Sequence, residues 1–383
     1  MKLVYSEDQA AYRDAVRRFV ERELRPLVEG KYDFSRPQTR QDVANLRADL
    51  AQHEIATEAP LFEDGSIDHI CFCIFIEEIS RVNIGLASLA GALFFPVWDM
   101  VDLLDEQQRE RFGHLFAPGE IVSMGLSEPN AGSNPSQIET VARRVDDGWI
   151  ISGRKLWTSH AQIASGILVA ARKIDGDDRQ VSLFMVDRQA QDYEVRTIPT
   201  LGMHATSTCE VAFDDMWVPA DAEMTPGKGG LASALNLVEQ ARLKMVFMAV
   251  GLAQAALDLA VQYAKDRSQF GKPIGSFQLV QGMLADMAVD LEAARLLGYR
   301  AASLYEAGLP ARSAMSMAKS YATEMAVRVT SLGIQVHGGI GLTQECNAER
   351  YFRDARMLTI PDGTTQIHQL VIGRELTGLS AFS

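Results

Sequence analysis

Four segments of the chain combine residue types that could hold a planar ligand carrying phosphates. Residues 124–134 (MGLSEPNAGSN) begin as a strand and break into a loop of small and hydroxyl residues, which can direct backbone N–H groups at a polar ring or a phosphate. Residues 156–159 (LWTS) set an aromatic side chain before two hydroxyls. In residues 267–274 (RSQFGKPI), the arginine and the glutamine are natural partners for a pyrophosphate and an adenine. The glycines of residues 335–341 (QVHGGIG) allow the backbone to approach a ligand closely.

Each of these patterns also fits a structural role when it is taken alone. Loops often have the composition of residues 124–134, and Trp157 could be a core side chain at the edge of a sheet. In residues 361–366 (PDGTTQ), Asp-Gly is a turn signal, and Asp362 could cap the following helix. The methionine-rich face of residues 245–263 indicates adaptable core packing rather than a cofactor contact.

Signatures of several other enzyme classes are absent from the sequence. No G-x-x-x-x-G-K-[ST] phosphate loop occurs, and residues 226–230 (PGKGG), which share its composition, are more typical of an interdomain linker. There is no G-x-S-x-G or H-E-x-x-H motif, and the seven histidines never pair at metal-ligand spacing. Cys71 and Cys73 lie in an apolar stretch without a nearby histidine pair, so we expect no metal site. Simple hydrolase and metalloenzyme functions are therefore disfavoured.

The composition is that of a soluble protein with a sizeable core. Of 383 residues, 47% are hydrophobic, and 37 basic against 50 acidic side chains give a net charge of −13, which disfavours a general nucleic-acid surface. The best apolar run, residues 71–76, is far shorter than the roughly 18 residues that span a membrane. The acidic opening of the chain is unlike a signal peptide, and four cysteines predict no disulfide framework. We expect a cytoplasmic enzyme.

Three zones of different periodicity must position the four segments, and they predict an α+β protein of several domains. Residues 1–120 show helical spacing, with a capping box that begins at Ser6 and a first helix that ends at Pro26. Further helices of this N-terminal helical domain are predicted within residues 46–53, 71–81 and 105–116.

Residues 121–225 have a period of two and predict a middle antiparallel β-barrel domain. Residues 146–148 (DDG) are a strong hairpin signal, and no helical pattern separates the strands. The six strands are predicted over residues 140–145, 149–153, 167–172, 180–186, 193–198 and 208–213.

Residues 226–383 are helical again and predict a C-terminal four-helix bundle. Gly308 and Gly333 have the spacing of helix-end residues. After the helix that carries the methionine-rich face, the predicted helices cover residues 278–307, 312–332 and 366–376.

Together, the four segments and the helical, β-rich and helical order resemble the acyl-CoA dehydrogenase family of flavoproteins. The resemblance covers essentially all 383 residues, and its motifs are specific jointly although each one alone is not. It implies an FAD-dependent enzyme that removes an α-proton from an acyl thioester, transfers a β-hydride to flavin and passes electrons to an electron-transferring flavoprotein. It also implies a homodimer or homotetramer whose subunits share each FAD site.

The resemblance assigns ligand contacts to the residues that match the family's motifs. Around the flavin it places Leu126, Ser127, Ser133, Trp157 and Ser159, where Ser159 replaces the usual threonine. At the pyrophosphate and adenosine it places Arg267, Gln269, Phe270 and Gln278, with Gln335, Gly338 and Gly339 of the neighbouring subunit. Thr364 and Gln366 are further cofactor contacts, and the acyl-CoA contacts are Ser133, Glu239, Arg242 and Arg374. On its helix face, Glu239 could equally be a solvated carboxylate.

The resemblance makes Asp362 the expected catalytic base. Family members carry Glu-Gly-Thr-[ST]-Gln before the last helix, and here Asp replaces Glu; the alternative glutamate that some branches place before the arginine equivalent to Arg242 is Ala241. Asp is shorter than Glu by one methylene, about 1.5 Å, and a misplacement of about 1 Å can cost roughly a hundredfold in rate. Asp362 therefore requires a compensating backbone shift or a substrate whose acidic carbon lies closer.

Other functions stay open on the sequence alone. An acyl-carrier-protein dehydrogenase of secondary metabolism would bind the same phosphopantetheine arm as CoA. A flavin oxidase of the same fold is disfavoured because nitroalkane oxidases pair their Asp with an Arg seven positions later, where this chain has Gln369. A non-catalytic helical scaffold is the alternative from another class. Met124 and residues 84–97 could border the acyl pocket.

Overall fold

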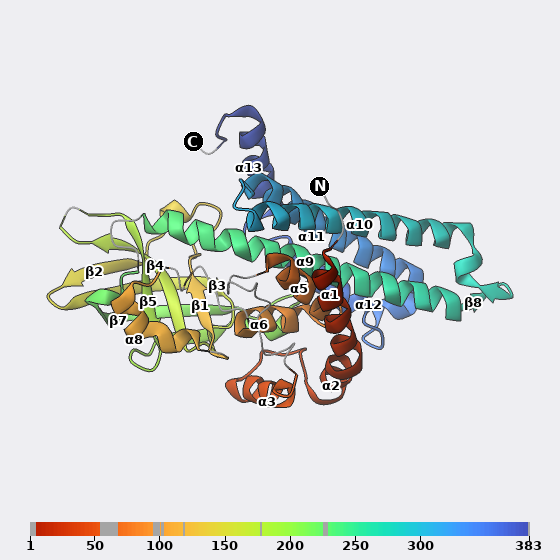
Figure 1. Cartoon of the computed structure of the whole chain (residues 1–383), viewed down its shortest axis with the longest axis horizontal. Helices are drawn as coiled ribbons and strands as arrows, with labels where there is room; N and C mark the ends of the chain where they lie inside the picture. The colour runs from red at the N-terminus through yellow and green to blue at the C-terminus, as the bar shows by residue number, and fades with distance from the viewer. Residues whose placement is uncertain are drawn as a thin grey trace.

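The computed structural model describes residues 5–53, 68–94, 100, 103–117, 119–176, 178–224 and 229–381. Figure 1 shows a β-sheet at one end of the molecule and long helices that extend to the other end. The helix α9 (Gly230–Asp266) runs from the sheet to the far end and connects the two parts. The predicted α+β fold class, with helical residues on either side of a β-rich middle, is confirmed.

The N-terminal part is helical, as the spacing of its apolar residues predicts. The Ser6 hydroxyl accepts a hydrogen bond from the Gln9 N–H while the Gln9 side chain accepts one from the Ser6 N–H, so the predicted capping box is present. The helices are α1 (Glu7–Phe19), α2 (Arg25–Lys31), α3 (Arg40–Leu50), α5 (His69–Ser80), α6 (Ile84–Phe94) and α8 (Glu106–Phe112), and a 3₁₀ turn covers Gly113–Phe116. Residues 95–97 of the predicted pocket border lie outside the described residues.

The prediction that Pro26 ends the first helix is wrong. A π-helical turn, Val20–Leu24, joins α1 to α2, and Pro26 stands in the first turn of α2. The Arg25 N–H donates to the Val20 carbonyl, five residues back. The π-helical turn lets the helical chain continue into α2. Proline is tolerated in the first turn of a helix, because an N–H group at that position would make no hydrogen bond within the helix.

The middle part is a curled sheet with the strand order β1-β4-β2-β3-β7-β6, and β5 pairs with β4. Its strands are β1 (Val122–Gly125), β2 (Val141–Val145), β3 (Gly148–Thr158), β4 (Gly166–Ile174), β5 (Val181–Asp187), β6 (Glu194–Thr197) and β7 (Cys209–Pro219). The predicted hairpin at residues 146–148 joins β2 to β3.

The sheet is mixed, whereas the sequence predicted a purely antiparallel one. Among the described strands, β4 pairs in parallel with both β1 and β2, and the other pairs are antiparallel. An apolar alternation does not reveal the direction of a neighbouring strand, and Gly166–Ala171 of β4 are all buried, as is usual for a strand covered on both faces.

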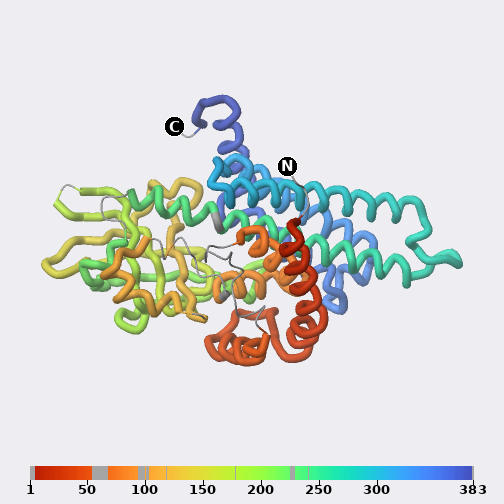
Figure 2. Tube along the Cα trace, in the orientation of Figure 1, coloured from red at the N-terminus to blue at the C-terminus, as the bar shows by residue number. Residues whose placement is uncertain are grey.

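The C-terminal part is helical. Besides α9 it contains α10 (Gln278–Glu306), α11 (Arg312–His337), α12 (Ala348–Leu358) and α13 (Thr365–Thr377). Three of these helices pack along α9, and the fourth, α13, packs against α11. The two-residue strands β8 (Ser268–Gln269) and β9 (Lys272–Pro273) form the hairpin that joins α9 to α10 at the far end (Figure 2). Residues 226–228 of the predicted linker lie outside the described residues.

Gly333 does not end α11, as the sequence predicted. The helix continues to His337 and ends at Gly338, whose φ of +63° suits a glycine. A Cβ at Gly333 would lie 3.8 Å from the carbonyl oxygen of Ala256, so this glycine faces α9 in the helix–helix contact.

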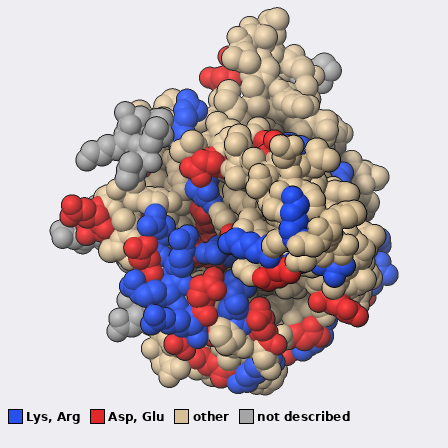
Figure 3. All heavy atoms as spheres, turned by 90° about the vertical axis from the view of Figure 1, so that its right-hand side faces the viewer, with Lys and Arg blue, Asp and Glu red and all other residues tan. Residues whose placement is uncertain are grey.

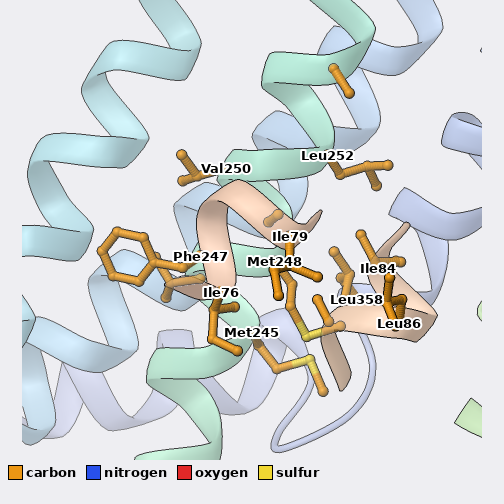
Figure 4. Packing of buried hydrophobic residues seen from close by; sticks show 14 of the residues in the cluster. Ile76, Ile79, Ile84, Leu86, Met245, Phe247, Met248, Val250, Leu252 and Leu358 are labelled. Atoms are coloured by element: carbon orange, nitrogen blue, oxygen red, sulfur yellow. The ribbon is translucent and has the colours of Figure 1, made fainter. Parts of the chain in front are cut away.

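A continuous apolar core binds the N-terminal helices to the C-terminal ones. Figure 4 shows Met245 and Met248 of α9 beside Ile76 and Ile79 of α5, with Leu358 of α12 close by. The methionine face is therefore core, as predicted. By length and composition α9 could cross a membrane, but 67% of its most apolar window is buried inside the protein, as in the core helix of a soluble protein.

The charged surface is mixed in sign. On the face drawn in Figure 3, Lys and Arg gather in one area with Asp and Glu among them. Ion pairs of this kind occur along the described helices, for example Arg328 with Asp290 at 2.9 Å and Arg353 with Glu349 at 2.6 Å. Such exposed pairs contribute little to stability.

Candidate active site

Two of the predicted ligand-binding segments lie side by side at the end of the sheet. The Leu156 N–H donates to the Ser127 carbonyl at 2.9 Å, and the Ser123 hydroxyl donates to the Ser159 carbonyl at 2.8 Å. The loop that contains Leu126 and Ser127 is thereby fixed against the end of β3. The sequence predicted that these segments share one ligand, and the structure brings them together.

Trp157 is an exposed residue, not a core side chain at a sheet edge. Its side chain and backbone are 58% exposed, and its φ of +63° lies in the left-handed region, which is costly for a bulky residue. Ser159 is also exposed, whereas Thr158 is buried and its hydroxyl has no partner among the described residues. The exposed aromatic face of Trp157 beside the exposed Ser159 is a surface for a planar polar ligand.

A buried ion pair supports this surface from below. The Lys155 ammonium lies 2.6 Å from the Glu128 carboxylate and donates to the Leu126 carbonyl at 3.2 Å, and Lys155 is 0% exposed. Glu128 also accepts from the backbone N–H groups of Glu139 and Thr140. Burial lowers the pKa of Lys155 to about 8, against the raising effect of Glu128. Burial also opposes ionisation of Glu128, but these hydrogen bonds hold the pKa of its carboxyl below the usual value.

Asp362 lies in the turn between α12 and α13 with a left-handed φ of +55°. The N-cap of α13 is Thr364, whose hydroxyl accepts the Ile367 N–H at 3.3 Å, so Asp362 is not the helix cap that the local pattern allowed. The following Gly363 also has a positive φ, +100°. Two consecutive left-handed residues give a sharp turn that directs the Asp362 side chain independently of the helix.

Three cations surround the Asp362 turn. Arg242 of α9 donates through Nε to the Asp362 carbonyl at 3.1 Å, and Lys319 of α11 donates through Nζ to the Gly363 carbonyl at 2.7 Å. Burial raises the pKa of Asp362, and Lys244, Lys319 and Arg242 act in the opposite direction. The result is a carboxyl group that accepts a proton more readily than an ordinary Asp, held in a turn fixed by two hydrogen bonds.

The lysines and a histidine at this turn are titratable groups that the sequence analysis did not select. Burial lowers the pKa of Lys319 to about 8, and burial together with Lys319 and Arg242 lowers the pKa of His368 to about 3. His368 lies beside Gly363. Because its pKa is lowered, its imidazole is neutral at neutral pH. An aliphatic stretch with one lysine, such as that around Lys244, gives no sequence signal that it faces a site.

Glu239 is held by arginines rather than solvated. It forms an ion pair with Arg312 of α11, 2.5 Å away, and lies 3.9 Å from Arg242. A chain of charges thus runs from Arg312 through Glu239 and Arg242 to the backbone of Asp362. Among the other predicted contacts, Ser133 of the loop after β1 and Gln366 and Arg374 of α13 are exposed, and Thr364 at the start of α13 is half-buried.

The remaining predicted contacts lie at the opposite end of α9. The β8–β9 hairpin carries Arg267, Gln269 and Phe270, all exposed, and Phe270 is 93% exposed. His337 stacks on Tyr263 of α9 with ring centroids 4.5 Å apart, which brings the exposed end of α11 next to this hairpin. The neighbouring exposed residues are Gln278, Gln335, Gly338 and Gly339.

One chain therefore presents two separate halves of the predicted ligand site. Figure 1 places the β8–β9 hairpin and the β-sheet at opposite ends of the long axis of the molecule. The end near the sheet offers an aromatic face, an exposed hydroxyl residue and a half-buried carboxyl group. The far end offers an exposed arginine, amides, an aromatic ring and glycines. Among the described residues, no group of three or more His, Cys, Asp and Glu side chains could hold a metal ion.

Sequence comparison matches the chain to one family along nearly its whole length. The N-terminal domain of acyl-CoA dehydrogenase matches residues 6–120, the middle domain matches residues 123–216, and the C-terminal domain matches residues 228–377.

Individual relatives agree with this result. The chain is 36% identical to a benzylmalonyl-CoA dehydrogenase of Aromatoleum aromaticum over 80% of this chain and 82% of the relative. It is 31% identical to the caffeyl-CoA reductase–Etf complex subunit CarC of Acetobacterium woodii over 97% and 98% of the two chains. A solved glutaryl-CoA dehydrogenase of Mycobacterium smegmatis in complex with FADH2 superimposes with a TM-score of 0.88 at 26% identity, covering 100% of this chain and 97% of that one.

Proposed function

Because the chain belongs to the acyl-CoA dehydrogenase family, flavin-using oxidoreductases that act on CH–CH groups, we propose that it introduces an α,β double bond into an acyl-CoA with Asp362 as the α-proton base. The observation that carries the proposal is the half-buried Asp362 in a strained turn, hydrogen-bonded through its backbone carbonyl to Arg242. Burial raises the pKa of this carboxyl above that of an ordinary Asp, which makes it a better proton acceptor.

The residues near the sheet fit a flavin ring. The exposed face of Trp157 and the exposed Ser159 are features that a planar, polar ring would cover. We propose Leu126, Ser127, Trp157 and Ser159 as its contacts. When bound, FAD supplies the two-electron acceptor for the hydride that leaves the β-carbon. The protein's own task is to orient the thioester, exclude water and hold the α-proton on Asp362.

The direct test is an anaerobic one. Purified protein that carries FAD is mixed with a series of acyl-CoAs, and bleaching of the flavin absorbance is followed in a stopped-flow spectrometer. We expect at least one acyl-CoA to bleach it within seconds. Rapid peroxide release in air would favour the oxidase alternative, and flavin that stays oxidised with every thioester would favour the scaffold. The acyl-carrier-protein alternative predicts bleaching only by carrier-bound acyl groups.

A prediction about cofactor choice follows from the far end of α9. Arg267 and Gln269 are exposed, as a site for the ADP half of FAD requires, so we expect the protein to retain FAD and not FMN. Arg267→Ala should weaken FAD retention by about tenfold or more, as for loss of a charge-assisted hydrogen bond. Retention is measured by flavin fluorescence after dialysis. Equal retention of FAD and FMN by the unmutated protein would contradict this assignment.

A prediction about assembly follows from the two separate half-sites. One chain holds the proposed ring contacts and the proposed ADP contacts at opposite ends, so we propose that two copies complete each FAD site. Flavin loss and subunit dissociation should then be thermodynamically linked. Sedimentation at falling protein concentration should show flavin release together with dissociation. A monomer that is fully flavinated and active would overturn the shared site.

Three further assignments complete the proposal. Electrons would pass to an electron-transferring flavoprotein, which the name of the Acetobacterium woodii relative, a subunit of an Etf complex, supports. The domains would be residues 1–120, 121–225 and 226–383, and the enzyme would work in the cytoplasm as a homodimer or homotetramer. The names of the relatives include benzylmalonyl, caffeyl and glutaryl groups, so family membership alone does not select the acyl group.

A further inference from the structure

Lys319 of α11 is a fully buried lysine, with 0% of its surface exposed. Among the described residues, its only hydrogen bond is the one that its amino group donates to the Gly363 carbonyl at 2.7 Å, and it forms no ion pair. Burying a charged amino group costs free energy unless other interactions offset that cost. A lysine whose one partner is a backbone carbonyl contributes little to stability, so its position points to a role at the turn that it contacts.

The turn that Lys319 contacts is strained. Asp362 and Gly363 have positive φ angles of +55° and +100°, and a non-glycine residue adopts such an angle only at a cost. This conformation persists only where the surrounding contacts determine it. Two contacts with α11 follow Asp362 directly, because Lys319 holds the Gly363 carbonyl and the Thr365 hydroxyl donates to Glu324 at 2.6 Å. Helix α11 therefore fixes the chain immediately after the proposed base.

The two cations that are bonded to this turn bind its backbone and not its carboxyl group. Arg242 donates to the Asp362 carbonyl, and Lys319 donates to the Gly363 carbonyl. In the described part of the chain, the Asp362 side chain forms neither a hydrogen bond nor an ion pair. A cation paired directly with the carboxylate would stabilise its charged form and weaken it as a proton acceptor. Bonds to the carbonyls position the side chain without that pairing, although the nearby charges still lower the pKa of the carboxyl.

We propose that Lys319 is a positioning residue of the reaction: it holds the Gly363 peptide and thereby keeps the short Asp362 side chain where it reaches the α-proton. The inference rests on the proposed function and adds a residue to it. A misplacement of the base by about 1 Å can cost roughly a hundredfold in rate. Arg242, the other bonded cation, is also a proposed acyl-CoA contact, so its replacement would change binding and position together. The interior Lys319 separates the two effects.

Hydrogen–deuterium exchange of the FAD-loaded protein tests the hold of Lys319 on the turn without turnover. Lys319→Met keeps the length of the stem and removes the ammonium. The backbone amides of residues 362–366 should then exchange about 10- to 100-fold faster, the range for loss of a hydrogen bond from a charged group. Thr330→Val is the matched control, because it removes a buried hydrogen bond of 2.7 Å to the Ala326 carbonyl on the same helix. It should leave exchange at the turn unchanged.

Anaerobic flavin reduction tests whether this hold acts through the base, with butyryl-CoA or glutaryl-CoA, whichever bleaches the unmutated enzyme faster. At saturating thioester, Lys319→Met should be about 10- to 100-fold slower. The half-saturating concentration should change by less than about threefold, because a buried residue that contacts only the turn adds no binding of its own. In an Asp362→Asn background the same replacement should cost less than about threefold, since no base is left to position. Lys319→Gln, which also removes the charge, is a second variant with the same expectations.

The outcomes separate the inference from the proposed function. Unchanged exchange at the turn in Lys319→Met, or an equal loss of rate with Asp362 and with Asn at residue 362, would overturn the positioning role. Bleaching of the unmutated enzyme would still support the dehydrogenase in that case. Conversely, faster exchange at the turn in Lys319→Met, in a protein that no thioester bleaches, would support the hold of Lys319 on the turn and contradict the dehydrogenation.

Discussion

Asp362→Asn should abolish most of the reduction of bound flavin by acyl-CoA. The amide keeps the size and polarity of the side chain, and the backbone carbonyl that Arg242 contacts is unchanged, so the fold and FAD binding should survive. The loss of a positioned base should slow flavin reduction by roughly 10²–10⁴-fold. In the unmutated enzyme, the rate should rise with pH as the carboxyl loses its proton. Since burial raises its pKa, this rise should lie above the range of an ordinary Asp, about 3.9.

Asp362→Glu is the companion variant. If the strained turn has adjusted the pocket to the shorter side chain, Glu will overpack it and lower the rate. If the short side chain is a compromise, Glu will raise the rate on straight-chain substrates. Flavin reduction by Asp362→Asn at the parental rate would place the base elsewhere. Glu239, held by Arg312, is then the next carboxylate to replace.

Lys155→Met should cause the largest loss of stability among the variants considered. It leaves the buried Glu128 carboxylate without its cation, and breaking a buried pair in this way costs about 3–5 kcal/mol in the free energy of unfolding. The Leu126 carbonyl also loses its donor, so the loop that carries Leu126 and Ser127 should loosen and FAD retention should fall. Urea unfolding and flavin retention measure the two effects.

Two controls make the Lys155 prediction specific. Arg154→Met removes the neighbouring residue's ion pair with Glu210, in which Arg154 is exposed, and should cost less than about 1 kcal/mol. The double variant Lys155→Met with Glu128→Gln should recover part of the loss, because no buried charge is then left unpaired. A single Lys155→Met variant as stable as Arg154→Met would show that the buried pair contributes little.

Local sequence signals predicted most of the elements but not their ends or strand directions. The Ser6 capping box and the Asp-Asp-Gly hairpin are short-range features whose partners lie a few residues away, so the sequence contains them completely. The helix ends predicted at Pro26 and Gly333 were wrong because the surrounding structure outweighed the local preference. A π-helical turn precedes Pro26, and Gly333 contacts α9. The parallel pairing of β4 with β1 and β2 depends on how distant segments meet, which periodicity does not encode.

The sequence likewise predicted some residues of the candidate site and not others. The sequence predicted that Ser127 and Trp157 would share a ligand, and a hydrogen bond from the Leu156 N–H to the Ser127 carbonyl does hold the two segments together. The resemblance selected Asp362 from its motif. Lys244 and Lys319 gave no signal, because a lysine in an apolar helix is common. Only the fold relates them to the Asp362 turn, where their charges lower the pKa of its carboxyl.

The position of the two half-sites at opposite ends of α9 has a genetic consequence. Consider two impaired chains in a shared-site dimer, one with Asp362→Asn and the other with Arg267→Ala. One composite site would receive both defects, while the other would combine the intact Asp362 of the second chain with the intact Arg267 of the first. Two null alleles of this protein should therefore complement each other when they damage opposite ends of the helix, and fail to do so when they damage the same end.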